Sequence, residues 1–340
     1  MTRSEAQSNP KWVQLVRAVA IMAIVFDHAI YPNISVNHVS ETLYIVTNWW
    51  DIPLLFIIGG VAITPIARTW AAFWHFVVQR LVPILGTYLA SGALLVLASH
   101  FIHQDSWRYT GYFFLRLLYG GQTLDGDLTL MWLFTVYLLT VLIVTLLVSW
   151  VDSPAIQVFI ALAMFALSVM YGTIGFLHFQ YMPWGADLVL MTTLWMISGY
   201  YVYQNWDKMQ FGRFYATAGL VIYGIMVYCR YEWGLNFELV LKEHHIKTPY
   251  MAAFVPLFMT LAIGIVCYWL AKKRWFDWLL PVGRFAVPII CMVQLTIDVV
   301  SHVSILNHIP ALWFLGLVVP MLIAGVYRMV LKQFRSQKLN

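Results

Sequence analysis

Charged residues are scarce in this chain. Lysine, arginine, aspartate and glutamate make up only 10% of its 340 residues, whereas 61% are hydrophobic and the mean hydropathy is +0.76. So few charges cannot cover the surface of a water-soluble globule of this length. The composition therefore excludes a soluble protein and predicts an integral membrane protein.

Cysteine is also scarce. The three cysteines, Cys229, Cys267 and Cys291, lie in apolar runs, and no Cys-x-x-Cys pair occurs. This pattern favours neither a disulfide framework nor a structural zinc site, and we expect no metal at the functional site. The net charge of +5 is what basic cytoplasmic loops produce, so we expect no nucleic-acid partner.

The chain lacks a long polar segment that could form a soluble domain, and its first apolar run has no small-residue cleavage pattern. Apolar runs of about 20 residues without period-2 alternation favour helices over a barrel, because backbone groups in lipid must be hydrogen bonded internally. We predict an all-α polytopic transmembrane helical bundle that forms a single domain over residues 1–340, with short tails at 1–11 and 332–340. The ten expected spans are 12–31, 43–66, 83–101, 129–150, 155–177, 184–203, 214–233, 250–271, 279–303 and 309–331.

Basic residues indicate the orientation of this bundle. If the N-terminus is cytoplasmic, fifteen of the 20 lysines and arginines lie on the cytoplasmic side and five on the other. The positive-inside rule then favours two cytoplasmic termini, which the even number of spans allows. Two outer segments are not plain spans: 102–128 predicts an interfacial or re-entrant element, and the polar loop 234–249 contains His244 and His245, interpreted as a solvated pair.

The first span has ionisable groups at both ends, with Arg17 at its start and Asp27-His28 towards its end. Such groups are costly in lipid and are usually retained for function. Eleven residues separate Arg17 from His28, so on a helix both lie on nearly the same face, roughly 16 Å apart. A cation facing the cytoplasm suits a phosphate-bearing ligand, and an imidazole facing outward suits proton transfer with a hydroxyl.

His28 is the candidate general base, because a neutral imidazole accepts a proton near pH 7. A carboxylate on its other ring nitrogen would hold the tautomer, but neighbouring helix residues point about 100° apart, so Asp27 is a poor choice. Asp51, Asp187 and Asp298, on other spans, are geometrically better partners.

Each of these residues also has a purely structural interpretation. A membrane histidine can simply hydrogen bond a neighbouring helix, and the carboxylates can reach water or cap helices. Arg17 and Arg80 can serve only as topology anchors at cytoplasmic helix ends. Gly59-Gly60 is interpreted as a site of close helix packing.

Several of these features occur together in one known family. The chain resembles the membrane-bound acyltransferase-3 family, mostly bacterial O-acyltransferases that act on cell-envelope or secreted glycans and have ten core helices. The resemblance rests on Leu15-Val16-Arg17-Ala18-Val19-Ala20 through Asp27-His28, on Pro53 to Gly60, on Arg80-Leu81-Val82-Pro83, on Leu130-Met131-Trp132-Leu133-Phe134 with Tyr137, and on Gly283-Arg284-Phe285.

Four positions depart from the family pattern. Val77 stands where the first arginine of an Arg-x-x-Arg pair is usual, Gly59 replaces a serine, and Thr129 and Gln294 stand where histidines are common. These departures could mark a subfamily with a different donor or acceptor.

The resemblance implies that His28 is essential for acyl transfer and that Arg17 and Arg80 bind the donor from the cytoplasm. The implied donor is an acyl-coenzyme A, usually acetyl-coenzyme A, which acts as a co-substrate and not as a permanently bound cofactor. The implied acceptor is a hydroxyl of a cell-envelope polysaccharide or glycolipid. Asp27 and Asp51 are further catalytic candidates, and the acceptor-side candidates are Asp187, Asp298, His302 and Trp132.

We therefore expect an O-acyltransferase in the bacterial cytoplasmic membrane that transfers an acetyl or a succinyl group. Such an enzyme could form a homo-oligomer or belong to a glycan-synthesis complex. The alternative is a proton-coupled transporter of a polar solute, or a flippase for a lipid-linked sugar, because buried Asp and His groups also form proton relays. A non-catalytic membrane scaffold is disfavoured, since it explains none of the intramembrane ionisable groups.

Overall fold

The computed structural model describes residues 10–174, 181–208, 213–237 and 239–337. Most of the predicted N-terminal tail, the last three residues of the C-terminal tail and the end of the fifth predicted span at 175–177 lie outside the described residues. The α-helices are α1 (Lys11–Ile30), α2 (His38–Asn48), α3 (Asp51–Gly60), α4 (Trp70–Phe76), α5 (Val82–His103), α6 (Trp107–Tyr119), α7 (Trp132–Trp150), α8 (Pro154–Ile174), α9 (Ala186–Gln204), α10 (Arg213–Trp233), α11 (Pro249–Ala271), α12 (Leu280–Arg284), α13 (Ala286–Ser301) and α14 (Ile309–Gln337).

Short helical turns connect several of these helices. They are η1 (Tyr31–Asn33), the π-helical η2 (Val77–Leu81), η3 (Gly121–Thr123), η4 (Gly126–Leu128), η5 (Pro183–Gly185), η6 (Trp206–Lys208) and η7 (Arg274–Leu279). Within the described ranges the only strands are β1 (Leu239–Val240) and β2 (His245–Ile246), which pair antiparallel with Leu239 opposite Ile246.

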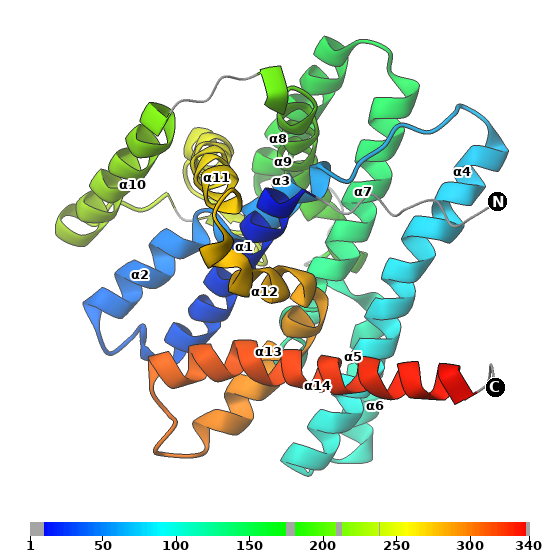
Figure 1. Cartoon of the computed structure of the whole chain (residues 1–340), viewed down its shortest axis with the longest axis vertical. Helices are drawn as coiled ribbons and strands as arrows, with labels where there is room; N and C mark the ends of the chain where they lie inside the picture. The colour runs from blue at the N-terminus through cyan, green and yellow to red at the C-terminus, as the bar shows by residue number, and fades with distance from the viewer. Residues whose placement is uncertain (1–9, 175–180, 209–212, 238, 338–340) are drawn as a thin grey trace.

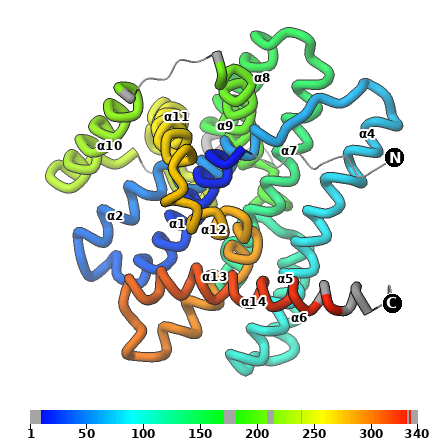
Figure 2. The backbone as a smooth tube through the Cα atoms, in the orientation of Figure 1, coloured from blue at the N-terminus to red at the C-terminus, as the bar shows by residue number. Residues whose placement is uncertain are grey.

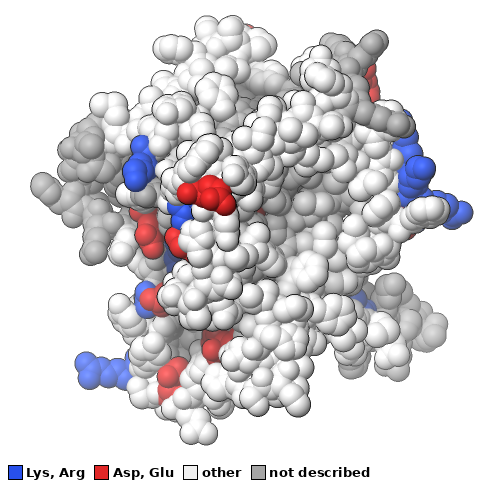
Figure 3. Space-filling view, turned by 90° about the vertical axis from the view of Figure 1, so that its left-hand side faces the viewer, with Lys and Arg blue, Asp and Glu red and all other residues white. Residues whose placement is uncertain are grey.

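The predicted all-α membrane bundle is confirmed. Six described helices are long and apolar enough to cross a membrane, or seven if α13 forms one span with the segment Arg274–Arg284, from which it is bent by 70°. The tube in Figure 2 shows where α12 and α13 follow each other. Over most of the face in Figure 3 no charged side chain is visible, as expected for a surface that contacts lipid.

The second predicted span, 43–66, corresponds to the segment His38–Gly60, which is long and apolar enough to cross a membrane but contains a turn. Helix α2 ends at Asn48, a turn follows at Trp49-Trp50, and α3 begins at Asp51 and ends at Gly60. Pro53 explains the new start, because a proline lacks an N–H and is tolerated in the first turn of a helix but not in its interior. The break places the Asp51 side chain at the beginning of a helix.

Helix α1 lies at the centre of the bundle, where it packs against α3, α11, α12, α13 and α14 (Figure 1). Most of its apolar residues are buried, and Val13, Val16, Ile21 and Val25 are fully inaccessible. A helix that is hydrophobic all round is expected in such a core position. The middle of α1 is therefore held by neighbouring helices.

The closest helix contact lies between α3 and α9, as the glycine pair at Gly59-Gly60 predicts. A Cβ atom added to Gly60 would lie 2.1 Å from the carbonyl oxygen of Met196, and one added to Gly199 would lie 1.8 Å from the carbonyl oxygen of Ile57. Backbones that approach this closely leave no room for any side chain. Small residues at helix crossings are the usual means of packing in membranes, where no hydrophobic force joins helices.

We predict that Gly199→Ala destabilises the protein, because the added methyl group meets immobile backbone and forces α3 and α9 apart. Overpacking of this kind costs about 1–3 kcal/mol. Gly86→Ala on α5 is the matched control, since nothing lies within 4 Å of its added Cβ. Thermal unfolding in detergent measures both; an equal melting temperature for the two variants would contradict the tight α3–α9 contact.

Candidate active site

The C-terminal end of α1 opens into a cavity of about 350 Å³, which we call the imidazole cavity. It brings together four of the predicted site residues, contributed by α1, α3 and α7. The wall also contains polar side chains that were not among the predicted site residues, including Lys242, Glu243 and Gln294. Its polar lining includes Asp27, His28, Asp51, Trp132, Lys242 and Gln294.

The partner of His28 is an amide and not the carboxylate that we expected. His28 Nδ1 lies 2.8 Å from Gln294 Oε1 on α13. With Nδ1 donating to this oxygen, the proton-accepting lone pair of the neutral ring is on Nε2, for which the described residues provide no hydrogen-bond partner. Gln294 thus fixes the tautomer that a general base needs.

Asp27 and Asp51 contact each other instead of His28. Both side chains are buried, with 5% and 1% of their surface exposed, and both line the imidazole cavity. Asp51 also accepts a hydrogen bond from the backbone N–H of Ile52, whereas no described residue donates to Asp27. The two carboxyl groups therefore form one buried acidic part of the cavity wall.

A β-hairpin formed by residues 239–246 covers the imidazole cavity. The side chain of Lys242 at its tip donates to Thr129 Oγ1 over 2.9 Å and lines the cavity. Burial lowers the pKa of Lys242 to about 8. The hairpin thus supplies a cation that titrates just above neutral pH.

Asp187 contacts this hairpin and is not part of the lining of the imidazole cavity. Its carboxylate lies 2.5 Å from His244 Nδ1 and also accepts a hydrogen bond from Gln122 Nε2. His244 Nε2 lies 2.9 Å from Ser168 Oγ. The interpretation of His244 as solvated is wrong, because only 9% of its side chain is exposed; the ion pair fastens the hairpin over the cavity.

Asp298 and His302 lie near the end of α13, outside the lining of the imidazole cavity. The His302 ring bonds the backbone carbonyl of Asp298 in its own helix, and the Asp298 carboxylate faces His103 of α5. The two residues are thus one turn or more beyond Gln294 on the same helix.

Arg17 lies at the other end of α1, where it lines a second cavity of about 240 Å³. Its side chain is half-buried and has no hydrogen bond or ion pair with any described residue. A cation held in this way without a counter-charge suits an anionic ligand. The neighbouring wall is formed by α3, α7 and α13.

Arg80 lines a third, wider cavity of about 700 Å³ together with His75 and Gln79. Its Nη1 donates to the backbone carbonyl of Ala62 over 2.6 Å, which fixes the guanidinium at the rim. Arg80 lies in the π-helical turn η2, and π-helical turns are frequent at functional sites. Tyr137 lines both this cavity and that of Arg17, so the two are adjacent.

The Arg17 cavity and the imidazole cavity are both lined by residues of α1, α3, α7 and α13. On α13 the first is lined by Ile290 and the second by Gln294, and on α3 they are lined by Leu55 and Ile52. The cavities are therefore stacked along α1, with a cation at one end and an imidazole at the other. A basic side chain thus lines one cavity and an imidazole lines the other.

The comparison with protein families identifies the chain more closely. The acyltransferase domain of the acyltransferase-3 family matches residues 11–329. The chain belongs to this family and is a membrane acyltransferase. Comparison with curated proteins and with solved structures found no match.

Sequence reasoning missed Lys242 as a site residue and noted Gln294 only as a departure from the family. A signal existed for Gln294, because an amide in the middle of an apolar run is nearly as costly as a charge and needs a partner. Lys242 gave no such signal. It stands in a polar loop, and only the hairpin fold turns it inward.

Proposed function

We propose that this protein transfers an acetyl group, or alternatively a succinyl group, from cytoplasmic acyl-coenzyme A to a hydroxyl of a cell-envelope polysaccharide or glycolipid. The proposal includes ten spans, two cytoplasmic termini and residence in the bacterial cytoplasmic membrane. The positive-inside count and the family membership support this placement.

One observation carries the proposal: Arg17, which pairs with none of the described residues, and His28, whose tautomer Gln294 fixes, line two cavities stacked on the same helices. Phosphates of a coenzyme A would meet Arg80 and Arg17, because guanidinium groups bind phosphate oxygens strongly. The thioester arm would extend along α1 towards His28. A helical rise of about 1.5 Å per residue makes this a path of roughly 16 Å.

The chemistry is then a single acyl transfer. The acceptor hydroxyl oxygen attacks the thioester carbon while His28 Nε2 takes the hydroxyl proton, and the carbon–sulfur bond breaks. The proton on the imidazolium passes to the leaving thiolate, which restores neutral His28. Gln294 holds the ring in the reactive tautomer, so it is a positioning residue.

Lys242 stabilises the negative charge that develops on the thioester oxygen. Its ammonium group faces the same cavity as His28 and is held by Thr129. Electrostatic stabilisation of such an oxyanion is usually a large part of catalysis, and it is stronger in a site shielded from water. The Asp27–Asp51 pair forms the opposite acidic part of the wall and is suited to hold sugar hydroxyls.

We predict that His28→Ala lowers the rate of acetyl transfer from acetyl-coenzyme A by about 100- to 10,000-fold, because the general base is lost. The measurement is release of free thiol by purified protein, with folding checked by melting temperature. His38→Ala is the matched control, since His38 is exposed at the start of α2. Full activity in His28→Ala would remove the assigned base, and failure of the wild type to use any acyl-coenzyme A would favour a transporter.

We also predict that the rate falls as the pH rises through about 8, because Lys242 with its lowered pKa then loses the proton that makes it a cation. Lys242→Arg stays charged over this range and should lack the fall. Lys242→Met should be slow at every pH. If the transfer rates of both variants fall with rising pH as the wild-type rate does, a group other than Lys242 is responsible for the fall.

A further inference from the structure

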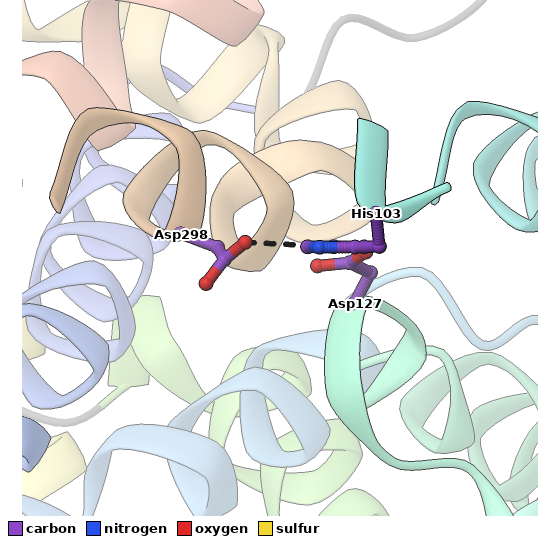
Figure 4. A group of neighbouring side chains, drawn as sticks. All are labelled: His103, Asp127 and Asp298. Carbon is purple, nitrogen blue, oxygen red and sulfur yellow. Dashed lines mark hydrogen bonds and ion pairs between the residues drawn. The ribbon is translucent and has the colours of Figure 1, made fainter. Parts of the chain in front are cut away.

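Three side chains from different segments of the chain converge, as Figure 4 shows. His103 comes from the end of α5, Asp127 from η4 and Asp298 from α13. His103 Nε2 lies 3.1 Å from Asp127 Oδ2 and 3.5 Å from Asp298 Oδ2. All three ligand atoms lie within 4.8 Å of one another.

These distances match the ligand spacing of a tetrahedral zinc site. Zinc binds imidazole nitrogen and carboxylate oxygen at about 2.0–2.2 Å, so two of its ligand atoms lie about 3.3–3.5 Å apart. The distances from His103 Nε2 to the two carboxylate oxygens are close to this range. One nitrogen and two oxygens leave a fourth position for water, as zinc sites with three protein ligands do.

Charge balance also points to a cation. Two carboxylates share a single imidazole, and among the described residues no lysine or arginine pairs with either of them. Even a protonated His103 would leave one negative charge uncompensated, and only 5% of the Asp127 side chain is exposed to water. Asp298 Oδ2 is buried and has no hydrogen-bond partner among the described groups. A divalent ion would neutralise both carboxylates and satisfy this oxygen.

We propose that His103, Asp127 and Asp298 bind one zinc ion. Calcium and magnesium fit less well, because they prefer six or more oxygen ligands or a near-octahedral oxygen shell. The ion would fasten η4 to α5 and α13, which contact each other here. Thr129 and Trp132, which line the imidazole cavity, follow η4 in the chain, and Gln294 lies one helical turn before Asp298. Because Thr129 holds Lys242 and Gln294 holds His28, the ion would stiffen the part of the wall that positions His28.

The test is the zinc content of the purified full-length chain. Protein in detergent is stripped with a chelator, incubated with zinc chloride, desalted and analysed by mass spectrometry for metal. We expect about one zinc per chain in the wild type and a rise in melting temperature on adding zinc. In His103→Ala and Asp298→Asn the zinc affinity should fall at least about 100-fold, since even indirect neighbours of a metal contribute 10- to 100-fold.

His302→Ala is the matched control, because this histidine is exposed, lies one turn from Asp298 and is not part of the cluster; it should retain the zinc. If His103→Ala does not fold, Asp298→Asn still tests the site. This variant is expected to fold, because a third of the Asp298 side chain is exposed at the surface and the substitution changes little in size. Less than about a tenth of an ion per wild-type chain, or equal zinc binding in the ligand variants, would overturn the proposal. Preferential loading of manganese over zinc from an equimolar mixture would overturn the choice of metal.

Discussion

The site depends on one constraint, which is the fixed distance between Arg17 and His28 along α1. Apolar neighbours pack around this helix and keep it rigid. Its core position leaves Arg17 and His28 with no freedom to approach each other, because every intervening turn is packed against α3, α11, α12, α13 or α14. A ligand that uses both residues must therefore be extended and charged at one end only. Acyl-coenzyme A has this shape, with its phosphates and its thioester at opposite ends of a long arm.

The other end of the site is assembled from polar groups that satisfy one another in an apolar surrounding. Gln294 holds His28, Thr129 holds Lys242, and Asp187 holds the hairpin through His244. Each contact joins segments that are far apart in the chain, so the imidazole cavity exists only in the folded bundle. Buried polar networks of this kind rigidify a site when all members have partners, and the proposed zinc ion would extend the network to η4.

The helical membrane fold and the placement of Arg17, His28, Asp27 and Asp51 could be predicted, since apolar length, helical spacing and the cost of charge in lipid are visible in one sequence. Partners from other segments could not. Nothing local indicates that Gln294 takes the place expected for a carboxylate, or that His103 meets Asp127 and also Asp298, which lies about 200 residues further along the chain. The turn inside the second span was also missed, because the apolar character of the segment continues through Trp49-Trp50.

The most direct test of the account is the sidedness of acyl transfer across the membrane. The protein is reconstituted so that its N-terminus faces the lumen of vesicles, and acetyl-coenzyme A with a labelled acetyl group is sealed inside. If the acyl group passes through the bundle, labelled acetate, formed with water as the acceptor, appears in the outside medium, and His28→Ala releases none. Acetate that accumulates inside the vesicles at the wild-type rate would contradict a path from Arg17 to His28 through the bundle.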